Sequence, residues 1–130
     1  MPNPNLNKVF LIGRLTRDPE LRYTSSGQAV TTCRLAVNRE YSAKTGEKKE
    51  ETCYVNLVVW GKRAEVAAEF LKKGNLIFAE GRLNYRTWEN NDSEKRSVLE
   101  VVVENFQFLE KPNVDIIEEK EDEINGKNQE

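Results

Sequence analysis

The sequence predicts an all-β domain that contains a single helix. Apolar residues recur at every second position in five segments, which is the period of a strand with one buried face. One segment, TCYVNLVVWGKRAEVAAEFLKKG at residues 52–74, changes from that period to the three-and-four spacing of an amphipathic helix. A strand that runs directly into a helix, in a chain otherwise made of strands, is typical of a five-stranded Greek-key OB barrel. That fold has its helix between strands 3 and 4.

The period and the turn-forming residues give the approximate bounds of each element. In chain order, we expect strands at residues 6–15, 29–39, 52–60, 75–88 and 97–109, a helix that ends before Gly74, and polar loops at 41–51 and 89–96. Arg22 and Tyr23, inside a turn-rich stretch, are a candidate short paired segment.

The first strand is apolar on both faces. Gly13 on its core face suggests a bulge or a sharp bend of the kind that a small barrel needs. Phe10 and Ile12 make the opposite face apolar as well. We therefore expect this face to be covered, either by the barrel itself or by a second subunit.

The third strand has two faces of different character. Its predicted core face consists of Cys53, Val55, Leu57 and Val59. The other face has Tyr54 and Trp60 at its ends, about 20 Å apart at the rise of a strand, with Asn56 and Val58 between them. That spacing suits several consecutive bases of an extended nucleic acid better than one small ligand.

The helix and the fourth strand follow. The predicted apolar stripe of the helix is Ala64, Ala67, Phe70 and Leu71, and Gly74 is the predicted left-handed C-cap. In the fourth strand Gly81 marks a bend, and the outward face changes from Leu76 and Phe78 to Arg86 and Trp88. This division predicts packing against a partner at one end of the strand and ligand contact at the other.

Nothing in the sequence argues for catalysis. It has no histidine, no phosphate-binding glycine loop, and two isolated cysteines that we expect to be buried free thiols, Cys33 and Cys53. Glu47, Glu50 and Glu51 alternate with lysines, which is typical of a solvated loop rather than a metal site. We therefore expect a protein that is not an enzyme and binds no cofactor or metal.

Charge divides the chain into two parts. Residues 1–109, the predicted OB domain, carry 17 Lys and Arg against 14 Asp and Glu, a net charge of +3. Residues 110–130 carry 3 Lys and Arg against 8 Asp and Glu, a net charge of −5. Their apolar residues follow neither the spacing of a strand nor that of a helix, so we expect a disordered acidic tail. A basic body with an acidic tail fits a polyanion binder. No apolar run approaches about 20 residues and no secretory signal is visible, which predicts a cytoplasmic protein.

Several motifs together resemble the bacterial single-stranded DNA-binding protein (SSB) family. They are NKVFLIGRL, DPELRY, WGKRAEVAAEFLKKG, EGRL and a tryptophan at position 88 before a polar loop, and the resemblance runs from about Asn7 to Leu109. It implies an OB fold, a homotetramer, and a nucleoid-associated protein that coats single-stranded DNA during replication, recombination and repair.

The resemblance also implies site residues. The stacking positions of the family match Tyr41, Tyr54, Trp60 and Trp88, where every base can offer a π face. Its backbone-contact positions match Lys62, Lys72, Lys73 and Arg86, whereas Asn56 replaces a frequent cation. The family recruits replication and repair proteins through an acidic tip that ends in Pro-Phe, and this chain ends instead in NGKNQE.

Two other functions share these residue patterns. A single-stranded RNA binder on the same fold would use the same stacking and phosphate contacts. An OB module that docks a protein would need neither. For each aromatic residue, packing in the core is the competing structural interpretation.

Overall fold

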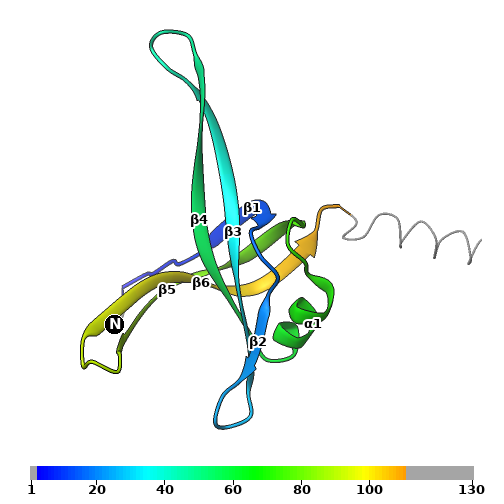
Figure 1. Ribbon diagram of the computed structural model, residues 1–130, viewed down its shortest axis with the longest axis vertical. Helices are drawn as coiled ribbons and strands as arrows, with labels where there is room; N and C mark the ends of the chain where they lie inside the picture. Colours follow the sequence, from blue (N-terminus) through cyan, green and yellow to red (C-terminus); the bar gives the residue numbers. More distant parts are fainter. Residues whose placement is uncertain (1–2, 111–130) are drawn as a thin grey trace, which may run out of the picture.

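The computed structural model describes residues 3–110, so the predicted disordered tail lies outside the described residues except for Glu110. The elements are β1 (Val9–Leu15), β2 (Glu20–Tyr23), β3 (Ala29–Ser42), β4 (Lys48–Trp60), α1 (Lys62–Phe70), β5 (Leu76–Glu89) and β6 (Lys95–Phe108) (Figure 1).

Five of the strands close into a barrel. Their order is β1-β5-β6-β4-β3, and a further pairing of β1 with β3 closes the ring. Leu11 of β1 lies opposite Ala79 of β5, whereas Leu15 at the end of β1 lies opposite Leu35 of β3. The helix follows β4, the third of the five barrel strands, which confirms the predicted fold class. β2 adds a strand to the free edge of β3, as the candidate paired segment predicted.

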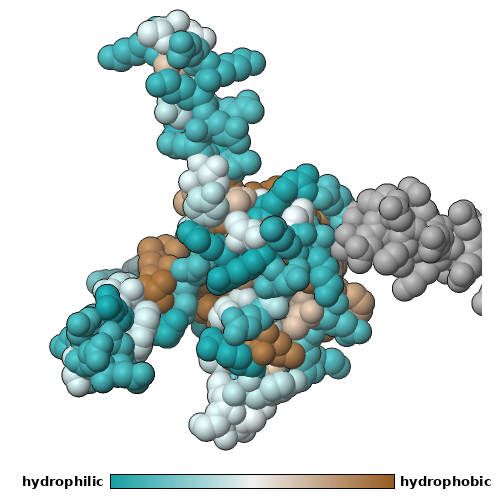
Figure 2. Space-filling model, viewed as in Figure 1, coloured by the Kyte–Doolittle hydropathy of each residue, from teal (hydrophilic) through white to brown (hydrophobic). Residues whose placement is uncertain are grey.

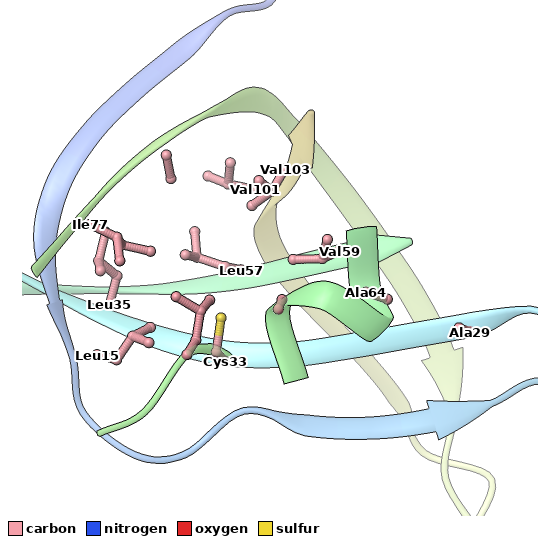
Figure 3. Packing of buried hydrophobic residues seen from close by; sticks show 13 residues of the cluster. Leu15, Ala29, Cys33, Leu35, Leu57, Val59, Ala64, Ile77, Val101 and Val103 are labelled. Atoms are coloured by element: carbon pink, nitrogen blue, oxygen red, sulfur yellow. The ribbon is translucent and has the colours of Figure 1, made fainter. Parts of the chain in front are cut away.

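The core lies inside the barrel and continues under α1 (Figure 3). It combines alternate residues of the strands with the small residues of the helix. The largest fully buried side chains are Leu35, Leu57, Leu71, Ile77, Val59, Val101 and Thr31.

Two glycines occupy positions where strands approach too closely for a side chain. A Cβ atom on Gly13 would lie 2.4 Å from the carbonyl oxygen of Ala36, and one on Gly81 would lie 2.1 Å from that of Val102. The pairing of β5 with β6 also shifts register between Glu80 and Gly81. The bends predicted at these glycines are therefore places where the backbone of one strand lies against another.

Helix α1 packs on the barrel through its smallest residues. Ala64 and Ala67 are fully buried, and Thr31 Oγ1 donates a hydrogen bond of 2.7 Å to the carbonyl oxygen of Ala64. The predicted apolar stripe is wrong at Phe70, which is 50% exposed. The helix ends at this residue, and the extended backbone at Leu71 directs the Leu71 side chain into the core instead.

The predicted helix C-cap at Gly74 is also wrong, because α1 already ends at Phe70. Gly74 lies in the following turn, with a φ of +90°, and its amide donates to the carbonyl oxygen of Leu15. Arg14 donates to the carbonyl oxygen of Gly74 and pairs with Glu110. This hydrogen-bonded pairing lowers the pKa of the Glu110 carboxyl group and joins the end of β1 to the end of β6.

The two polar loops are much shorter than predicted, because their residues extend the strands beyond the barrel. β3 and β4 remain paired as far as Ser42 and Lys48, and β5 and β6 as far as Glu89 and Lys95. The resulting β3–β4 arm and β5–β6 arm project from the barrel (Figure 1), and the surface of the β3–β4 arm is largely hydrophilic (Figure 2). Backbone hydrogen bonds hold the arms together without a buried face. The arm residues therefore lack the alternation of apolar and polar residues by which the sequence predicts strands.

The cysteines differ in environment. Cys33 is buried in the barrel, and burial raises the pKa of its thiol to about 12. Cys53 is a free cysteine but is exposed, contrary to the prediction. It pairs with Val37 where β3 and β4 leave the barrel, so the core face of β4 begins only further along the strand.

The outward face of β1 and β5 is apolar in the single chain. Phe10 and Ile12 are more than half exposed, and the ring of Phe10 stacks on Phe78 with their centroids 6.2 Å apart. The barrel itself therefore does not cover this face, which was one of the two possibilities that the sequence suggested. Among residues 3–110, no helix has the length and apolar character needed to cross a membrane.

Candidate functional site

A groove lies on the outward face of the barrel, where β2, β3, β4, β5 and β6 meet. It consists of two adjoining hollows of about 310 and 190 Å³ that share the side chains of Arg22, Thr32, Val58, Arg86 and Glu100. Trp88 lines the larger hollow and Trp60 the smaller one. We call this surface the groove.

The two tryptophans that the sequence singled out therefore line the same surface. Trp60 is the last residue of β4 and Trp88 is near the end of β5, and they are 40% and 41% exposed. Their partial exposure contradicts packing in the core. Because β4 alternates without interruption, Tyr54 lies on the same strand face as Trp60 and is also exposed.

The floor of the groove combines apolar and polar residues, with Val58 at its centre and the buried Glu100 beside it. Val58 lies between the aromatic residues of β4 but is buried, whereas the sequence grouped it with a face that meets a ligand. Its neighbours across the sheet are Thr32 on β3 and Val102 on β6. Val58 is buried because β4 pairs with β6, a pairing that the sequence does not reveal.

Arginine side chains stack on three of the predicted aromatic residues. The guanidinium carbons lie over the rings as follows: Arg34 over Tyr54 at 4.5 Å, Arg39 over Tyr41 at 5.2 Å and Arg86 over Trp88 at 4.7 Å. A cation against a ring face is attracted by the quadrupole of the ring and restrains the ring plane. In each pair the guanidinium group thus covers one face of the ring and restrains its orientation.

Arg86 also pairs with a buried carboxylate. Its Nε and Nη2 atoms donate to the two oxygens of Glu100 at 3.2 and 3.4 Å, and Asn84 Nδ2 donates to Oε1 at 3.4 Å. Glu100 is only 5% exposed and lies in the groove. The positive charge of Arg86 is thus balanced within the protein, and its side chain joins Glu100 to Trp88.

The structure does not bring all the predicted site residues into the groove. Tyr41 lies on the β3–β4 arm, in unbroken alternation with Val37, so it belongs to the opposite strand face from Tyr54. Lys72 and Lys73 follow the end of α1, and their backbone amides donate to Asn75 and Asp18. Lys62 lines a separate hollow on the other side of Trp60.

The groove also contains cations that the sequence did not single out. Arg17 and Arg22 line it, and Arg34 stacks on Tyr54. Arg22 belongs to the motif DPELRY, but nothing in the sequence of this short segment indicated that the Arg22 side chain faces the aromatic residues. Only the pairing of β2 with the edge of β3 places it there.

The described residues contain no arrangement suited to metal chemistry. Within residues 3–110, no three His, Cys, Asp or Glu side chains lie together as a metal site. In the same range, every buried polar side-chain atom has a hydrogen-bond partner. The groove offers aromatic rings, the apolar side chain of Val58, cationic side chains and one buried carboxylate that is paired with Arg86.

Comparison with known proteins identifies the family. The family model described as "Single-strand binding protein family" matches residues 6–109. The chain belongs to this family. Listeria monocytogenes "Single-stranded DNA-binding protein 2" is 49% identical over 108 residues, which are 83% of this chain and 66% of that protein. "Single-stranded DNA-binding protein A" of Bacillus subtilis is 49% identical over 83% of this chain and 62% of its own length. The chain therefore matches slightly less than two thirds of the length of these curated relatives.

Solved structures of the single-strand binding protein family share the fold. A crystal structure of a deletion mutant of the single-stranded DNA binding protein from Thermus aquaticus is 41% identical with a TM-score of 0.72, and the match covers 81% of this chain and 51% of that one. A Plasmodium falciparum SSB in complex with ssDNA is 29% identical with a TM-score of 0.75, over 85% of this chain and 100% of that one.

Proposed function

We propose that this protein binds single-stranded DNA without regard to sequence and protects it during replication, recombination and repair. The observation that carries the proposal is the groove, in which Trp60 and Trp88 line one surface together with the cationic side chains of neighbouring strands. Bases stack on exposed aromatic residues whatever their sequence, and cations neutralise the backbone. The names of the relatives and the ssDNA complex of a structural neighbour support the same function.

The proposed DNA site includes all the residues that the resemblance implied. Tyr54, Trp60, Trp88 and Arg86 belong to the groove face, with Lys62 next to it. Tyr41, Lys72 and Lys73 lie outside the groove, so DNA long enough to leave the groove would contact them. We add Arg17, Arg22 and Arg34 on the basis of their positions.

The proposed partners are single-stranded DNA and further copies of the chain. The exposed Phe10, Ile12 and Phe78 face would be buried in a homotetramer. The protein would act in the cytoplasm, with no catalytic activity of its own. Recruitment of replication and repair proteins through the acidic tail, residues 111–130, concerns a segment outside the described residues.

Titration with oligo-dT tests the function. Trp60 and Trp88 are the two tryptophans of the chain, so saturating oligo-dT should quench most of the tryptophan fluorescence. Log affinity should fall with log salt by about 0.7 for each phosphate contact on a single strand. Oligo-U of equal length should compete weakly. Stronger competition by oligo-U would favour the RNA-binding alternative, and absence of any salt-dependent binding would favour a protein-docking module.

A further inference from the structure

We propose that a second hollow, between the start of α1 and β6, is an additional subsite for the same DNA strand, with Arg63 as its backbone contact. This inference rests on the proposed function. The hollow measures about 510 Å³ and is lined by Trp60, Lys62, Arg63, Val66, Asn105 and Phe106. We call it the α1–β6 hollow.

The α1–β6 hollow adjoins the groove at one side chain. Trp60 lines the smaller part of the groove and also lines this hollow. A strand whose base stacks on Trp60 therefore has its adjacent nucleotide at the entrance of the α1–β6 hollow.

The charge of the hollow suits a phosphate backbone. Lys62 and Arg63 are the first two residues of α1, and both are exposed. Among residues 3–110, neither has a carboxylate within ion-pair distance, whereas Arg86 in the groove is paired with Glu100. The nearest acidic residue along the helix is Glu65, whose carboxylate accepts a hydrogen bond from Tyr23. Two cations without such partners at the positive end of a helix dipole attract an anion.

The walls of the hollow suit a base. Val66 is partly exposed on the surface of α1, and Phe106 is half-buried because its ring also packs against the core. A base between them would contact apolar side chains, one of which the core holds in place. Asn105 beside them offers an amide donor and acceptor for the polar edge of any base.

The test compares two exposed cations that each carry one charge. Arg63→Ala removes the proposed contact, and Lys44→Ala removes an equal charge from the end of the β3–β4 arm, away from α1 (Figure 1). Affinity is measured by tryptophan quenching over a range of salt concentrations. Two ligands are used: the shortest oligo-dT that still quenches, and an oligomer of about 16 nucleotides, the upper end of OB-fold site sizes.

Arg63→Ala should weaken the longer oligomer about 5-fold at 0.1 M salt and reduce its salt slope by about 0.7, with little change for the shortest one. Val66→Glu, which places a negative charge in the α1–β6 hollow, should weaken the longer oligomer in the same selective way. The inference is overturned if Arg63→Ala and Lys44→Ala give equal affinities and slopes for the longer oligomer while the unaltered protein binds DNA. No salt-dependent quenching of the unaltered protein would instead overturn the proposed function.

Discussion

Arg86 illustrates how one side chain can have a different role from the one that its charge suggests. A cation on a DNA-binding face is expected to contact phosphates, and the family resemblance implies this role for Arg86. In the structure, Arg86 is paired with Glu100 and stacked on Trp88. Its charge is already balanced, so we expect it to contribute to the proposed DNA binding mainly by orienting the ring.

A salt series separates these two roles. The double variant Arg86→Ala with Glu100→Gln removes the pair without leaving a buried charge alone. We expect weaker oligo-dT binding with an almost unchanged salt slope, whereas Lys62→Ala should lower the slope by about 0.7. If the double variant lowers the slope as much as Lys62→Ala does, Arg86 contacts a phosphate and the orienting role is wrong.

Trp60 and Trp88 give a second prediction at this scale. Replacing either with Ala should cost about 1–3 kcal/mol of binding per stacked base, or about 5- to 150-fold in affinity. Because both side chains are partly exposed, the free energy of unfolding should fall by much less than the about 3–5 kcal/mol expected for a buried tryptophan. Fluorescence titration and urea denaturation measure the two quantities. A large loss of stability with unchanged DNA affinity would contradict the stacking role.

At the scale of elements, the β3–β4 arm combines continuous strand pairing with the absence of a core. The strand pairs from Asn38 and Thr52 outward consist of exposed residues, with contacts such as the ion pair of 2.8 Å between Arg39 and Glu51. Elements with few buried apolar contacts open locally at low free energy. The outer part of the arm should therefore open without unfolding of the barrel.

Amide hydrogen exchange followed by mass spectrometry measures this difference. Peptides that cover Ser42 and Lys48 should exchange much faster than peptides that cover Leu35 and Leu57, although all four residues belong to the same two strands. Equal protection along the strands would show that the arm is as stable as the barrel. Oligo-dT should slow exchange in the arm if the strand reaches Tyr41.

The arms also show why the sequence predicts some elements better than others. Alternating apolar residues predicted the barrel strands, and a three-and-four spacing predicted the helix, because burial of one face imposes each period. The arms carry residues such as Lys49 and Glu50. Backbone hydrogen bonds pair these residues across the two strands, and such bonds produce no periodic pattern of apolar residues in the sequence. Cys53 was predicted as buried for the same reason, since the period shows which residues share a face but not where the barrel ends.

The candidate site was predictable to the extent that residue type indicates chemistry. Trp60 could be singled out because four apolar residues already fill the opposite face of its strand, and Trp88 because a charged loop follows it. Their common groove depends on the pairing of β6 with both β4 and β5, and the presence of Arg22 in it depends on the pairing of β2 with β3. The pairing of Arg86 with Glu100 depends on the register of β5 and β6 and has no signal in either strand alone.

At the scale of the whole molecule, the apolar face of β1 and β5 predicts assembly. Sedimentation should give a particle larger than the 15.0 kDa chain at micromolar concentration, with a tetramer as the proposed state. Ile12→Glu should shift the particle towards the monomer, because it places a charge in the apolar face. Tyr23→Glu, at an exposed position on β2, is the matched control and should leave the assembly intact. A monomer in the unaltered protein would contradict the proposal.

The closure of the barrel by β1 has a consequence for the order in which the molecule folds. β3 with β4 and β5 with β6 are hairpins of neighbouring segments, whereas β1 must pair with both β3 and β5, and Val9 lies opposite Gly81. Contacts between residues distant in the chain form slowly, because closing a long loop costs conformational entropy before the contacts can stabilise the structure. The two hairpins should thus form early, and the search that limits the folding rate should be the arrival of β1 between them. When β1 pairs with β3, the backbone of Ala36 comes close to Gly13. A side chain at position 13 should therefore slow this last step of folding and also destabilise the folded state.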